Sequence, residues 1–300
     1  MKNLLAPLLI IAMAAAVSCR PHSQEKITFN PNFTTYKNDS SGVKVKVEKK
    51  ETNYGLLTPV EICEIFNRLG VPYSNVALNP TANKNLYMSS SKASINLGIY
   101  GVDFGYLKMF GIGQQLIDYM LAIKDLSDKL GIPEELITDP VKKVQKDMAD
   151  ADTVTLMMQK AYKNIDNHLR ESGRESTAGL MVMGGWVEAM FIATQLVYNP
   201  VNPDPEVVQK IAEQKYALTS LLSFLKNYYD DPVVVYYTKK LKYLQHYFDS
   251  FEIYFEKGDL EIDTARHVLR SSGARMTVTV ETLDDIRDYV AKLRTEMVTI

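Results

Sequence analysis

Two carboxylates interrupt long apolar stretches of the chain and are the side chains best suited to chemistry. Asp103 lies within a helical pattern at 89–110, and Glu188 is the one charged residue in the stretch 178–198. A buried carboxylate has to be paired, hydrogen-bonded or protonated. We therefore expect both acids to have specific partners inside the fold.

The two acids form a candidate ligand pocket if their helices cross. In that case Asn96 and Trp186 lie nearby, and Asp103 and Glu188 face a polar pocket suited to a cation or small ligand. The alternative is that an Arg, Lys, Tyr or helix terminus satisfies each acid within the fold.

No other group of residues matches a catalytic, cofactor or metal motif. The histidines are scattered, and the nearest metal-like spacing, Asp263 with His267, is typical of an exposed pair on one helical turn. The sequence has neither a Gly-x-Ser-x-Gly elbow nor a phosphate-binding loop. We predict no catalytic residue, no metal site and no cofactor.

Tyrosines crowd the segment 216–255, where two interpretations compete. Exposed in a row, they would stack on sugar rings at the cell surface. Their helical spacing instead favours a core stripe. The stripe consists of Tyr236, Tyr243, Tyr247, Phe251 and Tyr254.

Small residues follow one face of each helix that carries an acid. One stripe is Ser94, Gly98, Gly101 and Gly105, and the other is Ala178, Gly185, Ala189 and Ala193. Glycine inside a helix costs up to about 1 kcal/mol in propensity, and close approach of another backbone is the usual reason for it. We expect the two helices to cross at the centre of the domain, with Gly101 and Gly105 facing Gly185 and Ala189.

The stretch 178–198 is also long and apolar enough to resemble a membrane span. Glu188 near its middle disfavours insertion by about 2.5–3.5 kcal/mol, and Gly184 and Gly185 add to the case against a span. We predict a buried central helix.

The remaining patterns predict an all-α fold, a multi-helix bundle of antiparallel helices. Asp-Pro pairs at 139, 204 and 231 are typical of helix starts, and Thr58-Pro59 begins a capping box. The predicted helices are 58–70, 89–110, 112–130, 140–148, 150–172, 174–198, 204–229, 231–257, 259–271 and 281–298. Two alternating segments, 43–47 and 276–280, either pair as a small two-stranded ribbon or are merely extended.

The N-terminus resembles a bacterial export signal that ends in a lipidation site. Lys2 precedes an unbroken apolar run from Leu4 to Val17, too short to anchor in a bilayer core of about 30 Å. The junction Ala16-Val17-Ser18-Cys19 resembles a lipobox, which implies that Cys19 is acylated, with palmitate among the chains. The alternative is an ordinary signal peptide with a chance cysteine.

These features divide the chain into a signal peptide at 1–18, a lipidated Cys19 with a tether at 19–57, and a helical domain at 58–300. Arg20 and Pro21 after the cysteine favour the outer membrane over the inner. The other cysteine, Cys63, has apolar helical spacing and is predicted to be a small buried hydrophobe. A reactive thiol is the alternative.

Composition excludes few functions. The net charge of −2 gives no reason to expect a nucleic-acid partner, and 46% hydrophobic with 23% charged residues is ordinary for a globular protein.

The segments Ser94–Leu107 and Gly184–Ala189 resemble a group of uncharacterised helical bacterial lipoproteins, over about 58–298. The resemblance implies an anchored helical fold and does not indicate any particular activity. We therefore expect an envelope lipoprotein, held to the membrane by its lipid, that is a non-enzymatic binding or scaffold subunit with an envelope protein as partner. The alternative is an envelope enzyme or a solute or glycan receptor with a site around Asp103 and Glu188.

Overall fold

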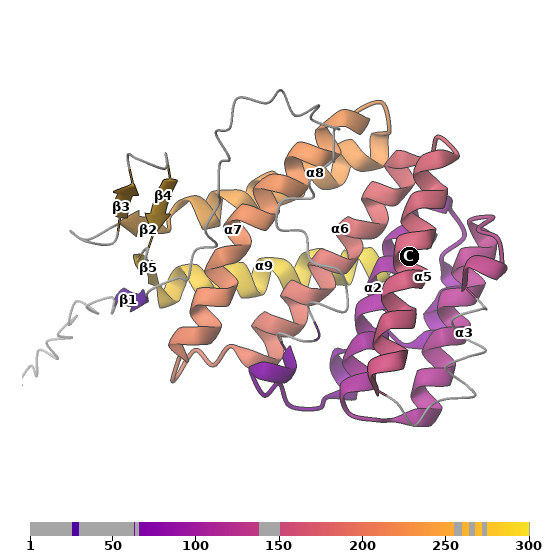
Figure 1. Cartoon of the computed structure of the whole chain (residues 1–300), viewed down its shortest axis with the longest axis horizontal. Coiled ribbons are helices and arrows are strands. Elements are labelled where there is room, and N and C mark those ends of the chain that lie inside the picture. Colours follow the sequence, from indigo (N-terminus) through magenta and orange to yellow (C-terminus); the bar gives the residue numbers. More distant parts are fainter. Residues whose placement is uncertain are drawn as a thin grey trace, which may run out of the picture.

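The computed structural model describes residues 26–29, 63, 66–137, 151–254, 260–263, 268–271 and 275–299. Only the backbone is described at 26–29, 151–158, 206, 252–254, 260–263, 268–271 and 275–277. Helices make up most of these residues (Figure 1), which confirms the predicted all-α multi-helix bundle.

The long helices follow the predicted ranges closely, apart from the C-terminal end of the predicted helix 231–257. They are α2 (Ser90–Met109), α3 (Gly113–Lys129), α5 (Ala151–Glu171), α6 (Glu175–Ile192), α7 (Pro205–Leu225), α8 (Pro232–Asp249) and α9 (Val280–Val298). Shorter turns are η1 (Asn75–Ala77), η2 (Thr81–Leu86), the π-helical η3 (Ala193–Val197) and η4 (Lys226–Tyr228). The predicted helix 140–148 and most of 58–70 lie outside the described residues.

Side-chain caps begin several helices. The Asp231 carboxylate accepts from the Val233 amide at 2.8 Å with Pro232 at the first helical position, as its Asp-Pro pair predicts. Ser89 caps α2 in the same way. Gly131 ends the helical segment before it with φ +63°, a conformation that favours glycine.

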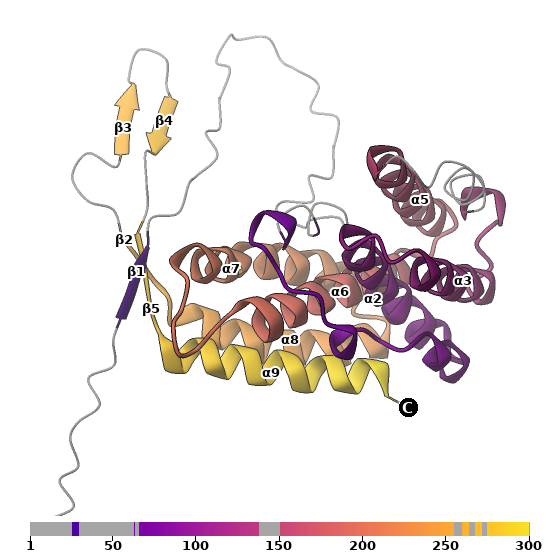
Figure 2. The ribbon, with the colours of Figure 1, turned by 90° about the horizontal axis from the view of Figure 1, so that it is seen from below.

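Helix α6 occupies the centre of the bundle. Helices α2, α3 and α5 lie on one side of it, and α7, α8 and α9 lie on the other (Figures 1 and 2). Residues of α6 belong to both hydrophobic clusters, one shared with α7, α8 and α9 and the other with α2 and α3. The segment Glu175–Val197 is long and apolar enough to cross a membrane, yet most of it is buried inside the bundle. A helix buried on all sides is expected to be apolar all round.

Helices α2 and α6 cross with their backbones in close approach. A methyl group at Gly98 would collide with the Met181 carbonyl oxygen, and one at Gly184 would collide with the Ile95 carbonyl oxygen. The predicted crossing of these helices is therefore present. Its register was predicted wrongly, because Gly185 lies against Gly98 and Val102.

A small sheet lies at the end of the bundle where α9 begins (Figure 2). Strand β5 (Arg275–Thr279) pairs antiparallel with β1 (Lys26–Phe29) and with β2 (Glu252–Tyr254). The predicted strand at 276–280 thus exists, but its partners are β1 and β2. Its predicted partner, 43–47, lies outside the described residues.

Two helix predictions in this region were wrong. Helix α8 ends at Asp249, and residues 252–254 of its predicted continuation form β2. The predicted helix 259–271 is replaced by the paired strands β3 (Leu260–Asp263) and β4 (Val268–Ser271). Strand pairing satisfies the backbone groups of these short segments, and β-branched residues such as Ile262 and Val268 suit a strand.

Candidate functional site

Glu188 forms a buried, two-pronged ion pair with Arg294 of α9. The Arg294 Nε donates to Glu188 Oε2 at 2.9 Å, and Nη2 donates to Oε1 at 3.1 Å. The same Nη2 donates to the Ala77 carbonyl oxygen at 3.0 Å, and the guanidinium lies 4.7 Å from the Phe191 ring centroid. The Glu188 side chain is fully buried, and Arg294 is its charge partner.

Asp103 lies beside this pair with a different set of neighbours. It is fully buried, and its Oδ2 accepts from the backbone N–H of Asn79 at 3.1 Å. Its Oδ1 receives no hydrogen bond from the described residues. Burial, and next the Glu188 charge, raise the pKa of Asp103 well above its usual value, and the opposing effect of Arg294 is smaller. In a protonated Asp103 the remaining oxygen, Oδ1, could act as a donor, and the neighbouring Glu188 carboxylate is the acceptor that favours the protonated form.

Asn79 connects the acids to the rest of a buried polar cluster. Its side-chain amide donates to the Tyr87 hydroxyl at 2.9 Å and to Asn96 Oδ1 at 3.1 Å. Its carbonyl oxygen accepts from the Tyr119 hydroxyl at 2.8 Å. These hydrogen bonds connect the segment 71–88 to α2, through Asn96 and Asp103, and to α3, through Tyr119.

Asn96, one of the predicted pocket residues, helps to hold the C-terminus of α9. Its side-chain amide donates to the Met297 carbonyl oxygen at 3.0 Å, and the Tyr87 hydroxyl donates to the Val298 carbonyl oxygen at 3.1 Å. The Lys92 ammonium donates to the Thr299 carbonyl oxygen at 2.7 Å. A cation and amide donors at this end satisfy carbonyls that have no partner within the helix.

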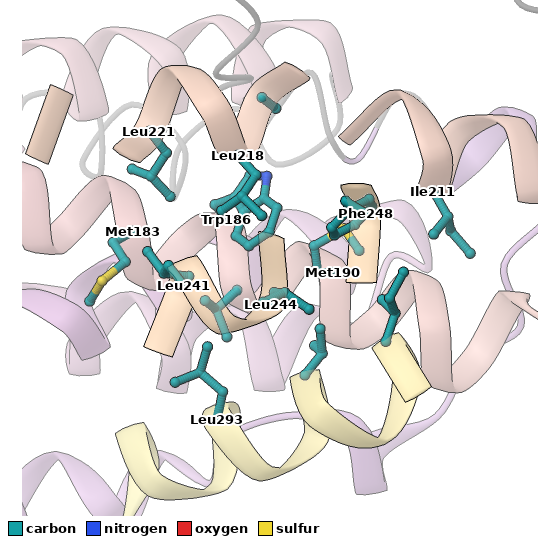
Figure 3. Close-up of a cluster of buried hydrophobic side chains, with 14 of the residues drawn as sticks. Met183, Trp186, Met190, Ile211, Leu218, Leu221, Leu241, Leu244, Phe248 and Leu293 are labelled. Carbon is teal, nitrogen blue, oxygen red and sulfur yellow. The ribbon is translucent and has the colours of Figure 1, made fainter. Parts of the chain in front are cut away.

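Trp186 does not belong to this cluster. It lies two residues before Glu188 on α6, about 200° around the helix, and so faces the opposite side. Its indole N–H donates to Gln214 Oε1 at 3.2 Å. Figure 3 shows Trp186 and Met190 among side chains of α7, α8 and α9.

The structure thus brings together three of the four predicted pocket residues: Asn96, Asp103 and Glu188. Arg294, Asn79 and Tyr87 were not predicted. The asparagine-rich loop at 71–88 was visible in the sequence, but nothing in it indicated buried donors. The approach of Arg294 depends on how α9 packs, and no local pattern encodes that.

A separate pocket of about 280 Å³ opens on the Trp186 side of α6. Residues of α6, η3 and α7 form its walls, together with Phe66 and Leu69. Its side chains are Phe66, Leu69, Trp186, Ala189, Met190, Ala193, Val197, Val207, Lys210, Ile211, Glu213 and Gln214.

The tyrosines of α8 divide between core and surface. Tyr237 is buried, whereas Tyr236 and Tyr243 are 49% and 56% exposed, so the predicted core stripe was wrong for these two. Phe251 is buried as expected, and the Tyr254 side chain lies outside the described part of the chain. The Tyr243 ring packs 5.1 Å from the Tyr289 ring between centroids.

The structure describes one of the two cysteines, Cys63, and not the other, Cys19. Cys63 is buried, as predicted for a small hydrophobe. Cys19 and the predicted export signal before it lie outside the described residues, as does His267 of the candidate Asp263–His267 pair. Within the described ranges, no group of three or more His, Cys, Asp or Glu side chains has a metal-binding arrangement.

Comparison with protein-family models, with curated proteins and with solved structures finds no match for this chain.

Proposed function

We propose that this chain is an envelope lipoprotein, anchored through Cys19, whose helical domain binds a ligand or partner protein and catalyses no reaction. The support for the anchor is the apolar run from Leu4 to Val17 followed by the lipobox-like junction at Cys19. Several acyl chains hold a protein on a membrane where one chain gives only marginal binding. The residues after Cys19 favour the outer membrane.

The pairing of the central acids with other side chains of the fold is the observation that argues against an active site at the centre of the domain. A general acid or base has to reach the proton that it transfers, within about 2.6–3.2 Å. Glu188 spends both oxygens on Arg294, and Asp103 is fully buried against Asn79 and Glu188. This arrangement favours a structural role for the acids over an enzyme or receptor site around them.

The position of β1 supports an orientation for the anchored domain. Lys26 follows Cys19 by seven positions, and an extended chain of that length spans at most about 25 Å. A lipid on Cys19 would therefore keep the β1–β5–β2 end of the bundle close to the bilayer. We propose that the opposite end, where α9 terminates, faces away from the membrane.

Fractionation of a cysteine variant tests the anchor. We expect wild-type protein to incorporate labelled palmitate and to stay with washed membranes. Cys19→Ala should lose the label and move to the soluble fraction, because the attachment through acyl chains is removed. The matched control is Cys63→Ser, which should keep both label and membrane location. Equal labelling of Cys19→Ala and wild type would contradict the proposal.

A further inference from the structure

The pocket beside Trp186 has the size of a small ligand site. Its volume is about 280 Å³. An engineered apolar cavity of about 150 Å³ in another protein binds benzene, so this pocket has room for roughly ten to twelve carbon atoms. It is accordingly near the lower end of the usual range for ligand pockets, about 300–1,000 Å³.

Small residues of α6 leave this space open. Ala189 and Ala193 line the pocket between the larger side chains of Trp186 and Val197. Helix α6 changes at Ala193 into the π-helical turn η3, a feature that often marks functional sites. A larger side chain at either alanine would project into the pocket.

The polar groups gather on one wall, formed by α7. Lys210 donates to Glu213 Oε2 at 2.7 Å, and Gln209 donates to Glu213 Oε1 at 3.0 Å, so both Glu213 oxygens are used. Gln214 is fixed by Trp186. The Lys210 ammonium has three donors, of which Glu213 takes one, and its side chain is 27% exposed. Among the lining side chains, Lys210 is therefore the one positioned to meet an anion.

We propose that this pocket binds a single-chain amphiphile with an anionic head, a fatty acid of about ten to twelve carbons. The chain lies against Trp186 and Met190, and the carboxylate meets Lys210 at the mouth. The pocket is mostly apolar, and on its α7 wall Lys210, which is paired with Glu213, keeps two N–H donors that a carboxylate could accept from. The inference rests on the proposed binding role and not on the anchor.

The fluorescence of Trp186 provides a site-specific test, because it is the one tryptophan in the chain. The full chain is reconstituted in phosphatidylcholine vesicles and titrated with terminally brominated undecanoate, whose bromine quenches indole emission on contact. We expect a saturable loss of emission that unbrominated undecanoate reverses. A protein that fails to anchor stays in the aqueous phase and is titrated there, so failure of the anchor and failure of the pocket are distinguishable.

Filling the pocket is the decisive variant. Ala193→Phe should raise the ligand concentration needed for half-maximal quenching by at least about tenfold. Ser223→Phe, on the exposed face of α7, should leave that concentration unchanged. If Ala193→Phe does not fold, as judged by circular dichroism, Ala189→Leu takes its place. Absence of saturable quenching, or equal quenching in the filled variant, would overturn the proposal.

Two further experiments test whether the carboxylate head group contributes to binding and whether the bound chain comes from free acid or from bilayer lipid. Lys210→Met should weaken binding of the brominated acid by about tenfold and leave a brominated undecanol unaffected. Vesicles of brominated phosphatidylcholine, without free acid, show whether bilayer chains enter the pocket. Quenching that Ala193→Phe abolishes identifies bilayer lipid as a source, and quenching that persists in Ala193→Phe would contradict binding at this site.

Discussion

Asp103 and Glu188 lie side by side in the interior, yet they are stabilised in different ways. Glu188 carries its charge against Arg294, and Asp103 is favoured in its protonated form by burial and by the Glu188 charge. The sequence predicted that these acids could approach one another, because their two helices were expected to cross. It was insufficient to identify Arg294, which is 106 positions from Glu188. The prediction that Trp186 lies near the two acids was wrong. Helix geometry already argued against it, because residues two positions apart on a helix point about 200° away from each other.

Removing the Glu188 charge should strongly destabilise the fold. In Glu188→Gln the Arg294 guanidinium remains buried without its counter-charge, which typically costs about 3–5 kcal/mol. Urea unfolding of the variant and wild type measures the difference. Asp128→Asn, which breaks the exposed pair with Lys124, is the control and should change little. An unchanged free energy of unfolding for Glu188→Gln would mean that Arg294 finds water or another partner.

The Asp103 proton should make stability depend on pH in a defined direction. Unfolded Asp103 ionises near its ordinary pKa of about 3.9, and folded Asp103 keeps its proton to higher pH. The stabilisation of the fold by protonated Asp103 is fully present below the pKa of the unfolded state. It is lost as pH rises towards the pKa of the folded state, by about 1.4 kcal/mol per pH unit.

Asp103→Asn should remove this dependence. Its amide keeps a donor towards Glu188 and an acceptor for Asn79 but cannot ionise. We expect the variant to exceed wild type in free energy of unfolding at about pH 7 and to converge with it near about pH 4. Asp118→Asn, at an exposed position, should run parallel to wild type. A variant less stable than wild type at neutral pH would indicate that an ionised Asp103 stabilises the core.

At the scale of elements, the α2–α6 crossing sets the frame that positions both acids. The small-residue stripes predicted which helix faces meet, because only small side chains permit such approach. They did not predict the register, which depends on packing around the whole bundle. Helix starts were predicted well because caps are local. Strand β2 was missed because its pairing is non-local, with β5 more than twenty residues further along the chain. Strands β3 and β4 pair with only four residues between them, so they were missed although their pairing is local.

Adjacent glycines of α6 offer a matched test of the crossing. Gly184→Ala forces a methyl group against the Ile95 carbonyl oxygen and should destabilise the protein by about 1–3 kcal/mol. Gly185→Ala places its methyl group 3.4 Å from the Gly98 carbonyl oxygen, an ordinary contact. It should be neutral or stabilising by up to about 1 kcal/mol, since alanine is the better helix former. Equal melting temperatures for the two variants would contradict the crossing.

At the scale of the whole molecule, one end of the bundle is joined to the N-terminal region. Strand β1 pairs with β5, and β5 leads directly into α9, which runs along the bundle towards the Asn96 and Lys92 contacts at its C-terminus (Figure 2). An anchor on Cys19 would therefore act on a helix that also carries Arg294. The pocket beside Trp186 is separate from the central acids, because neither Glu188 nor Arg294 is among the residues that line it.

The mass of the mature N-terminal peptide tests the central proposal, a lipid-anchored domain, most directly. We predict that the mature chain purified from membranes begins at Cys19 and that this residue carries two ester-linked chains on glycerol and one amide-linked chain. The mass should therefore exceed that of the unmodified peptide by this lipid, and the excess should be released in part by ester hydrolysis. A mature protein with an unmodified Cys19, or one that retains residues 1–18, would contradict the proposal.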